Sequence, residues 1–482
     1  MRLKTNVIIS AVFLALLGFV YFYEIKGGEE RRAETERAKQ LVDFGDHEVS
    51  RLVVDRGDTA LVLEKADGRW VVREPVEADA DGDAVDRYLR NLRETEMEKV
   101  VADSAAVAAD PALPAKYGLA EPRLRVLVEL ADTPLDTIRF GDDTPTERYT
   151  YGQRGGAASP VFAARAWRFD NLDKGLFDLR DRRVLAFDRD AVRQIRLERS
   201  WEEKPLVLAR AAGGDWALVE PLAAAADQVA VNAMVSRLAN GKAERFAAEA
   251  PDAAQLTESG LTPEGALIRL SLLLGDDRAE KRLTIGYEEA DGRHFALDAS
   301  RAPILVVDST LVGKLRVDLF ELRDRRPLRH DADAVTQVTL SRPGEPDLVA
   351  ARDTADASVW YVTSPQSREA RAWRLTSLLS DLDGMEVKAF VADGDGADGA
   401  SAPGLAEPRL TVTVERIDGE PLTVRFGDEI DDEVYVACGR SVYRVAATSF
   451  DQLNLTLDDV AQPVPEPAGD AAGNSAPAGS TD

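Results

Sequence analysis

Three stretches of the sequence decide the fold, because each carries the same landmark: Trp70-Val71-Val72-Arg73-Glu74-Pro75, Trp216-Ala217-Leu218-Val219-Glu220-Pro221 and Trp360-Tyr361-Val362-Thr363-Ser364-Pro365. The tryptophans are 146 and 144 residues apart. Two more landmarks follow in the same order in each copy, a Gly-Leu step and then a glycine turn. The steps begin at Gly118, Gly260 and Gly404, and the turns lie at Gly141, Gly286 and Gly427. Three ordered landmarks in three copies predict three repeats of one module.

The residues between the landmarks predict the secondary structure of the module. Short runs rich in β-branched residues end at each tryptophan stretch and are separated by Gly-Asp or Asp-Gly turns, which is typical of an antiparallel meander. An apolar stripe at helical spacing follows, and longer strand candidates and a short closing helix come after the Gly-Leu step. The stripes are Val85, Tyr88, Leu89 and Leu92; Val231, Met234, Val235 and Leu238; and Leu375, Leu378, Leu379 and Leu382. We expect an α+β fold of mainly antiparallel strands with one packed helix per module.

The chain should therefore be organised as one anchor and three modules. We expect a cytoplasmic start and transmembrane signal anchor at 1–26, a charged stalk at 27–43, modules at 44–187, 188–330 and 331–460, and a disordered acidic Pro/Ala/Gly tail at 461–482.

The anchor is predicted from an apolar run of seventeen residues, represented by Val7, Phe13, Leu17 and Tyr23, which is short for a membrane span but sufficient. Positive charge before the run favours an N-terminus inside and the bulk of the chain outside the cytoplasm, which predicts a single-pass protein of the inner membrane. A cleaved signal peptide is the alternative. Two features disfavour it, since the run exceeds the usual apolar length and no Ala-x-Ala-like site follows.

A basic pentapeptide closes the first two modules. It reads Leu179-Arg180-Asp181-Arg182-Arg183 and Leu322-Arg323-Asp324-Arg325-Arg326, whereas the third copy has Leu457-Asp458-Asp459-Val460. Because the motif stands only where another module follows, we expect a junction element whose arginines pair with acidic residues of the next module. A solvated helix end and an anion site remain the alternatives.

Composition and motif searches give no sign of catalysis. The net charge of −26, from 86 acidic and 60 basic residues, opposes binding to nucleic acid. The single cysteine, Cys438, reads as a core residue, and the three histidines, at 47, 294 and 330, lack metal-ligand spacing. The acidic stretch Asp79–Asp83 lacks the glycine and glutamate positions of a calcium loop, and Asp393–Asp398 lies in a low-complexity insert that the other copies lack. We expect no catalytic, cofactor-binding or metal-binding residues and no enzyme, with a hydrolase as the remote alternative.

The anchor, the Trp-x-x-x-Glu-Pro turns, the Gly-Leu steps and the Leu-Arg-Asp-Arg-Arg junctions together resemble the bacterial family catalogued as domain of unknown function 4340. The resemblance implies an envelope protein that is often encoded beside an ABC-type transporter and a gliding-motility-type membrane protein. It carries no catalytic residues. The resulting expectation is a non-enzymatic extracytoplasmic accessory subunit with protein partners in a transport or envelope complex. The alternative is a ligand-binding or sensor module with a site between repeats, whose small ligand the sequence does not identify.

Overall fold

The computed structural model describes residues 39–42, 44, 48–130, 137–326, 328–393, 402–417 and 419–463. The chain forms two compact units. The first consists of Met1–Ala186, Ala239–Gly265 and Ile285–Ser309, and the second of Phe187–Leu238, Ala266–Thr284 and Thr310–Asp482. The anchor expected at Val7–Tyr23, most of the stalk and most of the tail lie outside the described residues. Within the part of the chain that is described, no helix is long and apolar enough to cross a membrane.

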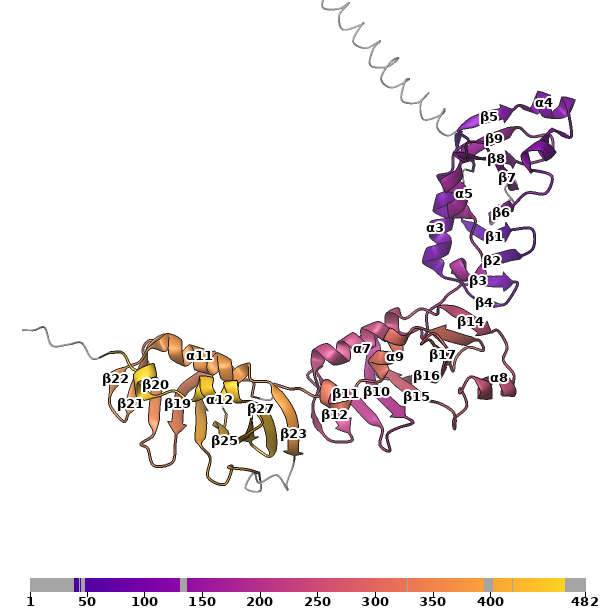
Figure 1. Ribbon diagram of the computed structural model, residues 1–482. Coiled ribbons are helices and arrows are strands. Elements are labelled where there is room, and N and C mark those ends of the chain that lie inside the picture. Colours follow the sequence, from indigo (N-terminus) through magenta and orange to yellow (C-terminus); the bar gives the residue numbers. More distant parts are fainter. Residues whose placement is uncertain are drawn as a thin grey trace, which may run out of the picture. The chain divides into compact units, whose positions relative to one another are not determined.

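The described strands form three antiparallel sheets of nine strands each, which confirms the α+β prediction and the three repeated modules (Figure 1). The first sheet, in the first unit, runs β4 (Ala78–Asp79), β3 (Arg69–Glu74), β2 (Ala60–Ala66), β1 (Val49–Asp55), β6 (Leu124–Leu130), β7 (Ile138–Asp143), β8 (Tyr149–Arg154), β9 (Val161–Arg165), β5 (Lys99–Ala102). The third sheet, in the second unit, runs β22 (Arg368–Glu369), β21 (Trp360–Ser364), β20 (Leu348–Arg352), β19 (Val335–Ser341), β24 (Leu410–Arg416), β25 (Leu422–Ile430), β26 (Glu433–Cys438), β27 (Ser441–Ala446), β23 (Val387–Asp393).

The second sheet repeats this order with strands that the two units share. It runs β13 (Ala224–Ala225), β12 (Trp216–Glu220), β11 (Leu206–Arg210), β10 (Val192–Arg199), β15 (Ile268–Leu274), β16 (Ala279–Glu288), β17 (His294–Asp298), β18 (Ile304–Val307), β14 (Arg245–Ala248). Strands β10 to β13 and β15 belong to the second unit, whereas β14, β17 and β18 belong to the first. Strand β16 runs through both.

The meander follows from alternation and turn chemistry. In β1, Leu52 and Val54 are fully buried while their neighbours are partly exposed, as expected where one face of a sheet covers a core. The turn between β2 and β3 places Asp67 and Gly68 at φ of 50° and 78°, the left-handed values that a tight two-residue hairpin requires. The landmark tryptophans are core residues, between 1% and 7% exposed. The peptide bonds before Pro75, Pro221 and Pro365 are cis.

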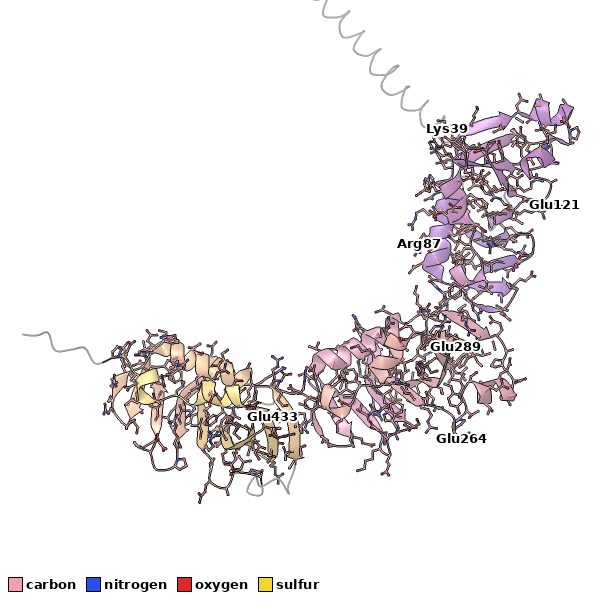
Figure 2. The ribbon with its side chains drawn as sticks, in the orientation of Figure 1. Lys39, Arg87, Glu121, Glu264, Glu289 and Glu433 are labelled. Carbon is pink, nitrogen blue, oxygen red and sulfur yellow. The ribbon has the colours of Figure 1, made fainter. Side chains whose placement is uncertain are left out.

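Each module packs a long helix on one face of its sheet, at the predicted stripes. These helices are α3 (Gly82–Arg93), α7 (Gln228–Asn240) and α11 (Ala372–Asp383). All the predicted stripe residues are buried except Leu89, which is half-buried. Figure 1 shows α3 beside α5 (Ala166–Leu172) and α11 beside α12 (Ala447–Leu453), and α9 (Ser309–Leu315) is the equivalent helix of the second module. Arg87 projects outward from α3 (Figure 2). The other helices are α4 (Ser104–Ala109), α6 (Leu176–Leu179), α8 (Ala253–Glu258), α10 (Leu319–Leu322), α13 (Leu457–Val460) and the 3-10 turns η2 (Leu113–Tyr117), η3 (Arg189–Ala191) and η4 (Ala332–Ala334).

The glycine landmarks mark a close approach of two backbone segments. A Cβ on Gly141 would collide with the carbonyl oxygen of Tyr117, next to Gly118, and the pairs Gly260–Gly286 and Gly404–Gly427 are equally crowded. The step and the turn recur together because only glycine allows this contact.

The closing helices correct the sequence alignment of the third junction. The backbone N–H of Arg180 bonds the carbonyl of Leu176 at 3.0 Å, and that of Arg323 bonds Leu319 at 3.1 Å. In the third module the same bond joins Ala461 to Leu457 at 2.8 Å. The position of the junction arginine is therefore Ala461 and not Asp458, three residues later than the sequence comparison placed it.

The module cores extend beyond the expected boundaries at both ends. Leu41 and Val42, assigned to the stalk, are buried in the core of the first module at 0% and 1% exposure. Ala461, assigned to the tail, is buried in the core of the third.

Candidate functional site: the arginine joints

The first basic pentapeptide forms a strap that connects two sheets. We call residues 179–184 the first strap. On one side, Asp81 N donates to Leu179 O and Asp181 N to Asp79 O, both at 2.9 Å, which extends the first sheet beyond β4. On the other side, Ala243 N donates to Arg182 O at 2.7 Å and Val184 N to Gly241 O at 2.8 Å, just before β14. All these residues belong to the first unit.

The second pentapeptide makes three equivalent backbone bonds within the second unit. We call residues 322–326 the second strap. Asp227 N donates to Leu322 O and Asp324 N to Ala225 O, both at 2.9 Å. Val387 N donates to Arg325 O at 2.8 Å, immediately before the rest of β23. The two straps therefore share the backbone bonds at residues 179, 181 and 182 and at residues 322, 324 and 325.

Arg180 fastens the first strap to the second module. Its side chain is only 4% exposed and donates from Nη1 to Glu249 Oε1 at 2.7 Å. The guanidinium lies 3.6 Å from the ring centre of Phe246 on β14, and Phe177 packs edge-on against that ring at 6.4 Å. The charge is thus paired on one side and stacked on an aromatic face on the other. We call this cluster, with the first strap, the first joint.

Arg323 makes the equivalent cluster on the third module. Its Nη1 and Nη2 donate to the two carboxylate oxygens of Asp393 at 2.7 and 2.6 Å. The guanidinium lies 3.5 Å from the ring centre of Phe390, and Phe320 packs edge-on against that ring at 5.7 Å. The hydrogen bonds from Arg323 hold the pKa of Asp393 below its usual range. We call this cluster, with the second strap, the second joint.

The remaining predicted junction residues divide into two groups. Arg182 and Arg325 stack on Phe177 and Phe320 of their own modules at 4.4 and 5.6 Å, and Arg325 also pairs with Glu386 at 3.0 Å. The other group stays within the strap: Arg183 donates to Asp181 through N at 2.9 Å and Nη2 at 2.6 Å, and Arg326 N donates to Asp324 at 3.0 Å. Burial would raise the pKa of Asp181, but the hydrogen bonds from Arg183 hold it below its usual range.

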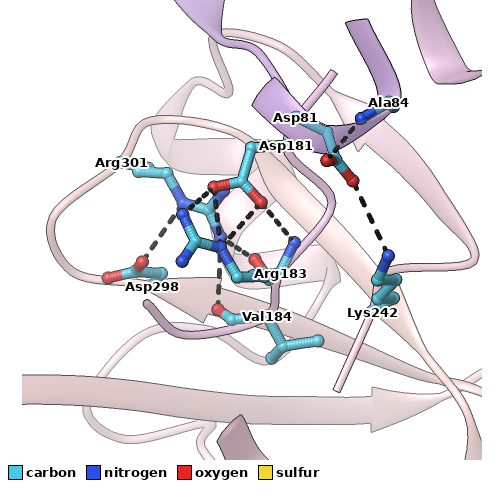
Figure 3. Close-up of polar contacts among 8 residues, drawn as sticks. All are labelled: Asp81, Ala84, Asp181, Arg183, Val184, Lys242, Asp298 and Arg301. Carbon is cyan, nitrogen blue, oxygen red and sulfur yellow. Dashed lines mark hydrogen bonds and ion pairs between the residues drawn. The ribbon is translucent and has the colours of Figure 1, made fainter. Parts of the chain in front are cut away.

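Arg301 makes a further set of contacts to the first strap (Figure 3). Arg301, on the β17–β18 turn, donates to the carbonyls of Arg183 and Val184 and to Asp298 Oδ2, the last at 3.1 Å. Asp298 is 2% exposed and also accepts from Ser300 N and Oγ at 2.9 and 2.8 Å. Lys242 Nζ lies 3.7 Å from Asp81, whose carboxylate caps α3 through Ala84 N. The acidic stretch at Asp79–Asp83 thus begins a helix and contacts the joint.

A cavity of about 570 Å³ lies beside the first joint. Its walls include the β3–β4 hairpin, Arg180, Asp181, Glu249 and Arg301. The basic side chains in its wall already have acidic partners: Arg73 pairs with Glu64 and Glu77, Arg180 with Glu249 and Arg301 with Asp298. The charged side chains around this cavity therefore stabilise the contact between the first two modules through ion pairs.

The other candidate groups lie apart from the joints. Over the described residues, no cluster of three or more His, Cys, Asp or Glu side chains could hold a metal ion. Cys438 is half-buried on β26, and burial raises its pKa to about 11, so the thiol stays protonated at neutral pH. His294 is buried, His330 Nδ1 lies 3.1 Å from Leu328 O, and His47 is outside the described residues.

Sequence reasoning identified the arginines but missed what receives them. Neither the acceptor rings, Phe246 and Phe390, nor the acceptor carboxylates, Glu249 and Asp393, were expected. Their strands, β14 and β23, follow the long helix yet pair with the last strand of the sheet, so sequence order does not place them near the strap. One signal was available, since Phe-Ala-Ala-Glu at 246–249 matches Phe-Val-Ala-Asp at 390–393.

Fold and joints together define a class of protein, an array of equivalent α+β modules connected by arginine straps. The chain matches the model of one family, a domain of unknown function (DUF4340), over residues 70–216, 216–403 and 360–465. These segments begin at the landmark tryptophans and cover more than half of the chain, so the protein belongs to this family, as the resemblance implied. No curated protein and no solved structure matches the chain.

Proposed function

We propose that this protein is a non-enzymatic accessory subunit of a membrane transport or envelope complex, which presents its modules to protein partners outside the cytoplasm. The observation that supports the proposal is the repetition of one joint. In both joints a nearly buried arginine, two phenylalanines and a carboxylate connect consecutive modules. A protein whose distinctive side chains fix neighbouring modules is suited to scaffolding.

The proposal keeps the predicted anchor and the predicted ABC-type transporter as the partner. The apolar run Val7–Tyr23 would hold the chain in the inner membrane, with the modules in the periplasm or its equivalent. A membrane-impermeant maleimide tests this topology on intact cells that carry Cys438→Ser and one new cysteine at exposed Arg87. Rapid labelling is expected, whereas labelling only after lysis would contradict an extracytoplasmic location.

Co-purification tests the partner. The full-length protein, tagged at its C-terminus, is purified from detergent-solubilised membranes, and the bound proteins are identified by mass spectrometry. We expect transporter subunits to be recovered reproducibly, and recovery should fall when Arg180→Ala and Arg323→Ala are combined. The single variant Arg87→Ala, on the exposed face of α3, is the matched control and should recover the same proteins as the wild type. Recovery of no membrane subunit from several preparations would count against the proposal.

A second candidate is a ligand-binding module, and the cavity beside the first joint is the observation that favours it. The cavity places acidic and basic groups, among them Asp79, Glu249 and Arg301, around about 570 Å³. A thermal-shift screen of the full chain against glycans, lipids and metal ions tests it. A specific upward shift that Arg301→Ala abolishes would favour ligand binding over the scaffold role.

A further inference from the structure

A second cavity, of about 550 Å³, lies in the first module at the edge of the sheet that ends in β5. We call it the β5 cleft. The first strap lies at the opposite edge of this sheet, where it extends the sheet beyond β4. Figure 1 shows β5, β9 and β8 side by side at one end of the module. The described walls of the cleft include Lys99, Thr144, Thr146, Tyr149, Tyr151 and Ala163. Its volume is usual for a small-molecule site, which spans roughly 300–1,000 Å³.

Two tyrosines on β8 form the aromatic wall of the β5 cleft. Tyr149 and Tyr151 are two residues apart on one strand and are both half-buried, so their side chains lie on the same face of the sheet. The guanidinium of Arg165 lies 5.2 Å from the ring centre of Tyr149. The ring of Tyr117 packs against that of Tyr151, with 4.6 Å between the ring centres. Rings that are already held by neighbours lose little conformational freedom when a ligand stacks on them.

The remaining walls supply hydrogen-bonding groups. The hydroxyls of Thr144 and Thr146, in the β7–β8 turn, lie 3.3 Å apart, and each can donate and accept. Lys99 adds an exposed ammonium donor, while Glu98 accepts from Arg165 Nε at 2.8 Å. Lys99 and Arg165 oppose a cationic ligand, and the net charge of −26 on the whole chain opposes an anionic one. The ligand that suits these walls is therefore neutral and rich in hydroxyl groups.

The other two modules place charged residues at positions that line the β5 cleft. Strand pairing aligns one row of residues across three strands of each sheet: Lys99–Ala163–Tyr151, Arg245–Val306–Phe295 and Ala389–Arg444–Tyr435. The first residue of each row directly precedes the related tetrapeptides at 100–103, 246–249 and 390–393. Arg444 thus takes the place of Ala163 in the third module, where it pairs with Glu433 at 3.3 Å. Arg293 takes the place of Tyr149 in the second module, two residues before the aromatic residue of the row. The paired tyrosines and the small alanine are therefore particular to the first module and are not required by the repeated fold.

We propose that the β5 cleft binds a neutral saccharide. A pyranose ring has a flat C–H face, which stacks on the rings of Tyr149 and Tyr151. Its hydroxyls bond to the two threonines and to Lys99. This binding goes beyond the scaffold role and does not depend on it, because every described residue of the cleft lies in the first module. The first module would thereby add a glycan contact to the array.

Calorimetric titration of the full-length protein, in a detergent without a sugar headgroup, tests the proposal. The probes are maltotriose, cellotriose and chitotriose, which are all neutral. At least one should bind, with an affinity that does not change between low and high salt. Tyr149→Ala should weaken this affinity about tenfold or more, whereas Tyr149→Phe, which keeps the ring, should stay within about threefold of the wild type. Binding of none of the three probes, or binding that high salt abolishes, would overturn the proposal.

Two further substitutions introduce the residues of the other modules into the cleft. Ala163→Arg supplies the residue of the third module and Tyr149→Arg that of the second. Because the same fold accommodates arginine at these positions, both variants should melt close to the wild-type temperature and should lose saccharide binding. Tyr361→Ala, which removes an exposed tyrosine from β21 of the third module, is the matched control and should bind as the wild type does. Unchanged binding by Ala163→Arg would refute the site. Loss of binding in Arg301→Ala but not in Tyr149→Ala would also refute it, because the saccharide would then lie in the cavity beside the first joint.

Discussion

The two described joints use one design with different reinforcement. In both, an arginine is held between a carboxylate and an aromatic ring, and a second phenylalanine packs edge-on against that ring. At the second joint Arg323 grips both oxygens of Asp393, whereas at the first Arg180 makes one bond to Glu249. The first joint adds Arg301, which binds the strap carbonyls. The arginine, the carboxylate and the two phenylalanines recur at both joints and therefore connect each module to the next. The contacts of Arg301 reinforce the first joint.

The two acceptor carboxylates differ in their exposure to water. The side chain of Glu249 is 41% exposed, and that of Asp393 is 30% exposed and held by two bonds. Arg323, at 9%, is slightly more exposed than Arg180, at 4%, so the difference lies in the carboxylate: one that is more shielded and held by two bonds loses more when its arginine is removed. We therefore expect the second joint to depend on its central arginine more than the first does.

The largest effect is expected for Arg323→Ala. The substitution leaves Asp393 without its partner and uncovers Phe390, which should destabilise the joint by about 3 kcal/mol. The amide of Val387, bonded to Arg325 O, reports this opening, and its hydrogen-exchange rate should rise about a hundredfold. Arg326→Ala, an exposed residue of the same strap, is the control and should change the rate by less than about twofold.

Arg180→Ala should have the next largest effect. We expect a loss of about 2 kcal/mol, because the partner carboxylate keeps more contact with water after the arginine is removed. Exchange at Ala243 N, bonded to Arg182 O, should accelerate roughly thirtyfold. Arg180→Lys should fall between wild type and alanine, since it keeps the charge but not the planar stack. A larger effect for Arg180→Ala than for Arg323→Ala would show that the burial of the acceptor carboxylate does not decide how much stability each joint loses.

Arg301→Ala tests the contribution of Arg301 to the first joint. Asp298 keeps its two donors from Ser300, so the loss should be only about 1.4 kcal/mol, which is roughly a tenfold faster exchange at Val184 N. The same variant should leave the exchange rate of the Val387 amide unchanged, because Arg301 does not contact the second joint. Acceleration at both amides would mean that the two joints are coupled.

Acidification should produce the smallest effect. The pKa of Asp393 lies below its usual 3.8 because Arg323 bonds the charged form, so this stabilisation is complete above about pH 3.8 and is lost as pH falls through the lowered pKa. The difference in melting temperature between wild type and Asp393→Asn should be constant above about pH 5 and should shrink in stronger acid. A difference that grows on acidification would have the wrong sign for this pair.

Much of the fold could be predicted because its signals are local. Apolar spacing located α3, α7 and α11, turn residues located the meanders, and the crowded glycines explain why two landmarks recur together. The edge strands β5, β14 and β23 escaped prediction, because they are short and pair with a strand far away in the sequence. The end of the third module was misaligned for a similar reason, since only backbone hydrogen bonds show that Ala461 stands where Arg180 does.

The sequence by itself determined the repeat, the module class, the family and the arginines that close each module. The tertiary structure alone decided what those arginines do, because their partners, Glu249 just after β14 and Asp393 at the end of β23, lie about 70 residues further along the chain. Pairing across such a distance depends on sheet order and strand register, which residue patterns within one segment do not encode. The backbone bond from Met97 N to Lys39 O is a further example, since it joins residues 58 positions apart that no local pattern relates.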